Sequence, residues 1–387
     1  MKLSAKHSKQ RASKMITKNY LAIACVLLSL LLLGCESTNT QIQPQTDSVA
    51  VTQNKEMSPY QLNSWFLKEI EEHGIKGVVA FVNEETFLNY FDLLSTQEEK
   101  ADINLLIKAV LKNLNGLLQS GGFSYLGTEE QSNRIWRSYY RVNSEDGRFL
   151  YFHLVWHQGR YLVDVKSESL AHSTLEFMAI SHLVTELEES QQIIFVQVMK
   201  SLAGGDIEQA VSQLKNLSDT AKSNEFVQHT LMRTISVMPL EQTRPFVDKL
   251  VKMIGEEKLT GLAWLEYHMQ NKAYPKALDL LDSTPEYVRQ DTFQMFQKGG
   301  IYAELKDYAS LWQIIHDTLY FNGEGYANYI LAAQLVILME EYQYAVELFN
   351  ILESKFDAVI SEQDLSEWKG GQSFIDSAAY KKWRERA

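Results

Sequence analysis

His153 and His157 carry imidazole side chains, which bind metal ions when they lie close together. The two residues stand four positions apart in an alternating segment, so an extended strand would direct both rings to one face of a sheet. A strand rises about 3.3 Å per residue, which separates the rings by about 13 Å. Because this distance is too long for one ion without a bulge in the strand, we predict no metal site and two separate, partly exposed imidazoles on the side that faces solvent or the helices.

Arg137, Tyr139 and His153 form a second group of residues whose side chains could take part in binding or catalysis. Around a closed apolar pocket these side chains could bind or hydrolyse a small molecule, whereas a filled core on the same face of the sheet would exclude that function. Asp164 is expected on the face opposite to the histidines. There we predict an ion pair with Arg137 or Arg141 at the edge of the strand.

The sequence contains no complete catalytic motif. Gly122-Phe-Ser124 begins like the nucleophile elbow of a hydrolase, but it lacks the closing glycine and a preceding strand. Gly323-Glu-Gly325 is half of a dinucleotide fingerprint and falls between two expected helices. We interpret both as turns. With no His-Glu-x-x-His motif, phosphate loop or paired-cysteine site, we predict no enzyme activity, no metal and no cofactor.

These residues belong to a predicted α+β domain over residues 58–168. Amphipathic helices are expected first, and among them are residues 59–73 and 102–118. Alternating apolar residues then predict a meander of three antiparallel strands, over residues 135–142, 149–157 and 160–166. This order of elements looks like the cystatin-like or nuclear-transport-factor-2-like domains over residues 75–170, which implies helices packed on one face of the sheet.

Residues 169–387 contain a short sequence pattern, called the phrase below, that recurs at a fixed interval. An aromatic residue is followed three positions later by a small or apolar residue, and then by further apolar residues, beginning at Tyr274, Tyr308 and Tyr342. Ile207 begins a similar phrase about two intervals before Tyr274. A period of about 34 residues is typical of helix-turn-helix repeat arrays. The phrases resemble the tetratricopeptide repeat family, which implies an all-α solenoid.

The resemblance also implies roles for single residues. Ala210, Ala277 and Ala345 match the small residue that lets paired helices approach, and the three tyrosines would fill the seam with the next repeat. Such arrays bind proteins on a concave surface formed by the first helix of each repeat. The exposed residues predicted to line that surface are Tyr267, Gln270, Gln294, Lys298, Asn328 and Gln334.

The N-terminus has the pattern of a targeting segment. Basic residues precede an apolar run over residues 21–33, which is too short to cross a bilayer. The run ends in two leucines, followed by Gly34 and Cys35, a sequence that resembles the lipobox of bacterial lipoproteins. The resemblance implies a signal peptide over residues 1–34, cleavage between Gly34 and Cys35, and acylation of Cys35. The polar residues 35–57 are then a flexible tether.

Two details refine this expectation. Glu36 follows the cysteine in place of the aspartate that retains enterobacterial lipoproteins at the inner membrane, so the resemblance favours the outer membrane of the cell envelope. Translation could start at Met1 or at Met15, because the segment from Met15 onward is a complete signal by itself.

The charge limits the choice of partner. Six of the 37 basic residues and none of the 49 acidic residues lie in residues 1–34, which leaves a body with 31 basic against 49 acidic residues. Such an acidic surface argues against nucleic acid. We therefore predict a lipid-anchored envelope protein that acts as a protein-binding scaffold through its helical repeats. The alternative is a small-molecule-binding or hydrolytic α+β domain with the repeats as a docking arm.

Overall fold

The computed structural model describes residues 57–95, 102–119, 121–131, 134–144, 149–236, 238–321 and 325–385. Gly34, Cys35, the rest of the predicted signal peptide and the tether up to residue 56 lie outside these ranges. Contacts divide the chain into two compact units, the first ending at Ala263 and the second beginning at Trp264. The division therefore does not fall at the expected boundary after residue 168. Among the described helices, none has both the length and the apolar character needed to span a bilayer.

An antiparallel sheet of four strands lies in the first unit. In spatial order the strands are β1 (Gly121–Gln131), β2 (Ile135–Ser144), β3 (Phe149–His157) and β4 (Tyr161–Ser167). The three predicted strands are confirmed as β2, β3 and β4. The additional strand β1 corrects the expectation of three strands, because Gly122 and Ser124 pair with Asn143 and Arg141 of β2 instead of forming a turn.

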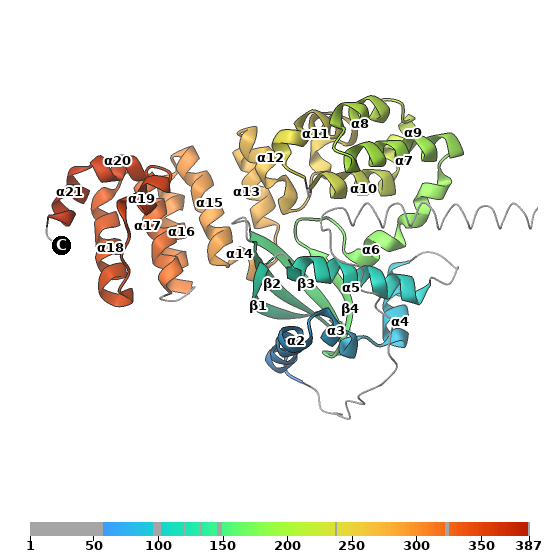
Figure 1. The fold of residues 1–387 in the computed structure, drawn as a ribbon, viewed down its shortest axis with the longest axis horizontal. Coiled ribbons are helices and arrows are strands. Elements are labelled where there is room, and N and C mark those ends of the chain that lie inside the picture. The colour runs from blue at the N-terminus through green and yellow to red at the C-terminus, as the bar shows by residue number, and fades with distance from the viewer. Residues whose placement is uncertain are drawn as a thin grey trace, which may run out of the picture. The chain divides into compact units, whose positions relative to one another are not determined.

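Helices cover one face of this sheet (Figure 1). They are α2 (Pro59–His73), α3 (Ile75–Val78), the short 3₁₀ helix η1 (Val79–Phe81), α4 (Glu84–Leu94) and α5 (Ile103–Gln119). Ser58 caps α2, since its hydroxyl accepts from the Gln61 N–H while the Gln61 side chain accepts from the Ser58 N–H. In the core, the rings of Phe66, Phe81 and Trp156 meet edge to face with centroids 5.3 to 5.7 Å apart.

Helical segments continue the first unit after the sheet. They are α6 (Thr174–Ala179), η3 (Ser181–Glu186), α7 (Glu189–Ala203), α8 (Ile207–Leu214), α9 (Asp219–Ser223), α10 (Glu225–Ser236), α11 (Leu240–Ile254) and η4 (Glu256–Lys258). Helix α6 packs against α4, α5 and β4, and its Leu175 is buried in the core beneath the sheet. The sheet and the first helix after it therefore share one core.

The second unit is described entirely by helices. They are α12 (Leu265–Gln270), α13 (Tyr274–Asp282), α14 (Glu286–Arg289), α15 (Thr292–Leu305), α16 (Tyr308–Phe321), α17 (Tyr326–Leu338), α18 (Tyr342–Phe356), α19 (Glu362–Glu367), α20 (Gly371–Asp376) and α21 (Ala378–Arg384). Helices α12 and α13, α15 and α16, and α17 and α18 form packed pairs, and α15 also contacts α13 and α17. At the end of the unit, Phe349 stacks on Trp383 with a centroid distance of 5.5 Å.

The period of the repeated phrase sets where helices begin. Helices α11, α13, α16 and α18 begin at Leu240, Tyr274, Tyr308 and Tyr342. Three residues into each of these helices, and into α8, the side chain is fully buried: Ala210, Thr243, Ala277, Leu311 and Ala345. A side chain at this position faces the neighbouring helix in every phrase, whether it is alanine, threonine or leucine.

The tyrosines that begin the phrases have different environments. The ring of Tyr342 packs against Phe374 with a centroid distance of 5.7 Å, and Tyr274 is half-buried. Tyr308 is 44% exposed, so the expectation that it fills a seam between helices is wrong at this position.

Candidate functional site

Three of the six residues expected to line an exposed binding surface are buried. Tyr267, Gln294 and Asn328 are 8%, 2% and 6% exposed. The Gln294 amide donates to Thr284 Oγ1 at 3.0 Å, and Thr292 Oγ1 donates to Asn328 Oδ1 at 2.9 Å. The expectation of exposure is wrong for these residues, because they pack inside the second unit and the amides of Gln294 and Asn328 hydrogen-bond to other segments of it.

The other three residues of that set keep some exposure. Lys298 Nζ lies 2.6 Å from Asp282 Oδ1, and the Gln270 amide donates to Glu266 Oε1 at 3.0 Å. Gln334 is half-buried. These contacts of Lys298 and Gln270 lie within the second unit. A solvent-exposed hollow in this unit, described next, is lined by other residues.

That hollow has a volume of about 360 Å³ and is open to solvent. It lies between the N-terminal ends of α15 and α17 and the segment around α19, and the side chains that characterise it are Phe293, Tyr326, Ile330, Val359, Asp364 and Trp368. Val359 is 87% exposed and Tyr326 is 48% exposed. The hollow therefore presents apolar and aromatic surface to solvent, with one carboxylate among its lining residues.

The group Arg137, Tyr139 and His153 lies on neighbouring strands, as predicted, but two of its members are buried and paired. Tyr139 is 1% exposed, and its hydroxyl donates to Glu129 Oε2 at 2.9 Å. Burial and this bond raise the pKa of Tyr139. His153 is 4% exposed, with Nδ1 2.5 Å from Glu168 Oε1 and its ring edge-on to Tyr139. These side chains fill their face of the sheet, which weighs against a ligand pocket at this group.

Asp164 differs from its predicted placement. It pairs in register with Val155 of β3, so it lies on the face that was expected for the histidines, because the register of the two strands shifts nearby. The carboxylate is fully buried and accepts from the Ser173 hydroxyl at 2.5 Å, the Leu175 N–H at 3.1 Å and the Val165 N–H at 2.8 Å. Burial raises the pKa of Asp164 to about 7, against these three hydrogen bonds, which lower it.

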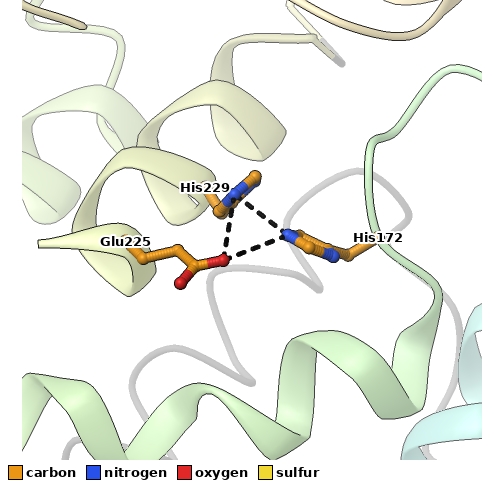
Figure 2. A group of neighbouring side chains, drawn as sticks. All are labelled: His172, Glu225 and His229. Atoms are coloured by element: carbon orange, nitrogen blue, oxygen red, sulfur yellow. Dashed lines mark hydrogen bonds and ion pairs between the residues drawn. The ribbon is translucent and has the colours of Figure 1, made fainter. Parts of the chain in front are cut away.

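Three further side chains, those of His172, Glu225 and His229, converge on one point (Figure 2). His172 comes from the segment between β4 and α6, while Glu225 and His229 lie one turn apart on α10. The Nε2 atoms of the two histidines are 2.9 Å apart, and each lies 3.8 Å from Glu225 Oε1. The arrangement offers two imidazole nitrogens and one carboxylate oxygen as ligand atoms.

The electrostatics of this group favour neutral imidazoles. Burial is the main cause that lowers the pKa of both histidines, and for His229 the result is about 4, with His172 and Lys258 adding to the effect. Glu176 and Glu225 oppose the change at His172. Near neutral pH, the Nε2–H of one histidine therefore donates to the lone pair on Nε2 of the other.

Sequence reasoning did not identify this group. Glu225 and His229 are four positions apart in a segment with helical patterning, which is the spacing that brings two side chains together on one helix face. That spacing was a usable signal. His172 stands far before Glu225 in an irregular segment, and only the folded chain brings it to α10.

Models of protein families, curated proteins and solved structures were each compared with the chain, and none of them matches it. The functional proposals below therefore depend on the residues and contacts of this chain alone.

Proposed function

We propose that the chain is a lipid-anchored protein of the bacterial cell envelope that binds another protein through tetratricopeptide-like helical repeats. The anchor rests on the lipobox-like residues that end at Gly34 and Cys35. Glu36 supports an outer-membrane location for the anchored protein. The binding role rests on the hollow in the second unit, which is the observation that carries the proposal.

The repeat assignment is supported by the regular helix starts. Helices that begin at one repeated interval, each with a fully buried residue three positions later, are what stacked helix pairs require. In such arrays the first helix of each pair faces the bound partner. The hollow is lined by Phe293 of α15 and by Tyr326 and Ile330 of α17, which are first helices of their pairs.

The chemistry of the hollow indicates the kind of segment it would bind. Exposed aromatic and aliphatic surface favours one large apolar side chain as an anchor. The carboxylate of Asp364 accepts from the Ser361 hydroxyl at 2.6 Å and from the Ser361 N–H at 3.0 Å, and these bonds lower its pKa. A permanent negative charge at the rim favours a lysine or arginine beside the apolar anchor.

Site-specific photo-crosslinking in intact cells tests this proposal. A photoreactive amino acid replaces Val359 in the hollow or, as the control, Leu93 of α4, which is 82% exposed. We expect one envelope protein to crosslink from position 359 and not from position 93. The same protein, once identified and purified, should bind Tyr326→Ala about 30-fold more weakly, because loss of an aromatic anchor costs about 2 kcal/mol.

Two results would contradict the binding role. One is equal crosslinking from positions 93 and 359, which would indicate non-selective contact. The other is unchanged affinity of the purified partner for Tyr326→Ala, provided that the variant keeps the helix content of the unsubstituted chain.

A further inference from the structure

The loop before α6 and helix α10 are joined by His172, Glu225 and His229, a group that the proposed binding role does not use (Figure 2). The side chains of His172 and His229 are 27% and 20% exposed, and that of Glu225 is 53% exposed. The group is therefore accessible from solution on one side. The two histidines and the carboxylate form a compact group of three possible ligand atoms.

The distances between the three ligand atoms are close to those in a metal site. Atoms separated by 2.9, 3.8 and 3.8 Å lie on a circle with a radius of about 2.1 Å, so one point between them is equally far from all three. Zinc binds imidazole nitrogen at about 2.0–2.1 Å and carboxylate oxygen at about 2.0–2.2 Å. We propose that His172, Glu225 and His229 bind one zinc ion, with a fourth coordination position open to solvent.

The donor set favours zinc over the common alkaline-earth ions. Calcium and magnesium prefer oxygen ligands, whereas two imidazoles and one carboxylate suit divalent ions of the zinc class. Glu176 Oε2 lies 3.9 Å from Nδ1 of His172, the nitrogen that would not bind the metal, which is an ion-pair distance and longer than a hydrogen bond. Lys258, whose positive charge helps to lower the pKa of His229, donates to Gln228 Oε1 at 3.1 Å.

The local structure already holds the three ligands in place. Ser173, next to His172, caps α6 and donates its hydroxyl to the buried Asp164, which fixes the loop. Glu225 and His229 are fixed on one face of a helix with well-buried neighbours such as Phe226. Zinc would tie the segment after the sheet to α10 once the two nitrogen atoms move apart from 2.9 Å and the Glu225 oxygen moves closer than 3.8 Å to reach tetrahedral geometry, and it would add to the stability of the first unit.

Metal titration of the full chain in detergent tests the proposal. Cys25→Ser and Cys35→Ser are introduced so that no thiol competes for the metal. Competition with a chromophoric chelator should show one zinc ion per chain, and millimolar magnesium or calcium should not displace it. Cobalt should give the visible absorption bands of a four-coordinate site.

Matched variants locate the site. Glu225→Gln and His229→Gln should each weaken zinc binding by at least about tenfold, since even outer residues of a metal site contribute this much. His73→Gln is the control: Glu69 and His73 have the same spacing on α2, with Oε2 and Nδ1 3.2 Å apart, and are in no group of three ligands among the described residues. It should bind zinc with unchanged affinity.

The unfolding temperature distinguishes loss of the zinc site from loss of the fold. Zinc should raise the unfolding temperature of the unsubstituted chain and of His73→Gln, but not that of Glu225→Gln. If His229→Gln does not fold, the more exposed Glu225→Gln carries the test. The proposal is overturned by no zinc binding, by equal affinity in Glu225→Gln and the unsubstituted chain, or by displacement with magnesium.

Discussion

Asp164 is a buried carboxylate that accepts three hydrogen bonds, from Ser173 at the cap of α6, from Leu175 within α6 and from Val165 of its own strand. Burial disfavours its charged form more strongly than these bonds favour it, so the pKa of Asp164 rises to about 7. An aspartate in the unfolded chain has a pKa near its ordinary value of 3.8. Between these two values the folded chain holds a proton that the unfolded chain has released.

This difference predicts how stability depends on pH. Because the folded state binds more protons, the free energy of unfolding falls as the pH rises from about 4 to about 7, and the loss is complete above that window. Asp164→Asn cannot ionise and can still accept from Leu175 and Val165. We expect it to be more stable than the unsubstituted chain at pH 8, by on the order of 2–4 kcal/mol, and to differ little at pH 4.

Urea unfolding at pH 4, 6 and 8 measures this prediction. Asp164→Ala is the control, since it removes the charge but leaves two backbone N–H groups without an acceptor and should be destabilised at every pH. Parallel stability curves for Asp164→Asn and the unsubstituted chain would show that the carboxylate does not titrate in this window.

At this scale the sequence could identify residue types but not neighbours. The alternation around His153 placed it correctly on a strand with Tyr139 on the adjoining one. It could not supply Glu168 as the partner of His153, or Ser173 as the partner of Asp164, because these residues lie in irregular segments whose path is set by packing.

Turns of one form precede four of the helices, α8, α13, α16 and α18. Two residues before α8, α13, α16 and α18 the backbone has a positive φ, at Gly205, Lys272, Lys306 and Glu340. In each turn the next residue donates its N–H to the carbonyl five positions earlier, over 2.9 to 3.2 Å. This is the bond pattern that ends a helix with a left-handed residue, for which glycine is best suited.

Glycine at such a turn should stabilise the second unit. Lys306 is exposed, with φ +56°, so Lys306→Gly relieves a strained conformation and removes no buried contact. The relief exceeds the entropy that glycine adds to the unfolded chain, and we expect a gain of roughly 0.5–1 kcal/mol. Denaturant unfolding measures it.

A helix-interior change provides the comparison. Glu347 is exposed in the middle of α18, and Glu347→Gly should lose about 1 kcal/mol. If Lys306→Gly loses stability to the same extent, then the turn imposes no strain that glycine can relieve.

At the scale of elements, periodicity was a strong signal and composition a weak one. The phrases at Tyr274, Tyr308 and Tyr342 predicted where three helices begin. Strand β1 escaped prediction because glycines at 121, 122 and 127 disfavour a strand by local propensity. Its pairing with β2 outweighs that preference, and pairing is a contact between segments that a local pattern does not contain.

Among the described residues, one hydrophobic cluster lies under the sheet and another lies among the last helices of the chain. The proposed anchor lies at the opposite end of the sequence from the second cluster, at Cys35. Composition and period correctly indicated a sheet with helices followed by many helices. The extent of the first unit, to Ala263, could not be predicted, because it depends on contacts made by α6 to α11.

The proposed lipid anchor at Cys35 can be tested in growing cells. Cys35→Ala should abolish labelling of the protein with radioactive palmitate, because the thiol that would be acylated is missing. It should also leave an uncleaved precursor of larger apparent mass, since cleavage follows acylation in lipoproteins of this type. Cys25→Ala, within the apolar run, should keep both labelling and processing, and equal labelling of all three chains would exclude Cys35 as the acceptor.

Helix α6 has a consequence for how this protein could change over evolutionary time. Its Leu175 and Ala179 complete the core beneath the sheet, and the Thr174 hydroxyl bridges Asn113 of α5 and the Val165 carbonyl of β4. A recombinant protein in which a different helical array followed the sheet after residue 168 would lack the α6 side chains that complete this core. The sheet and α6 must therefore be inherited together.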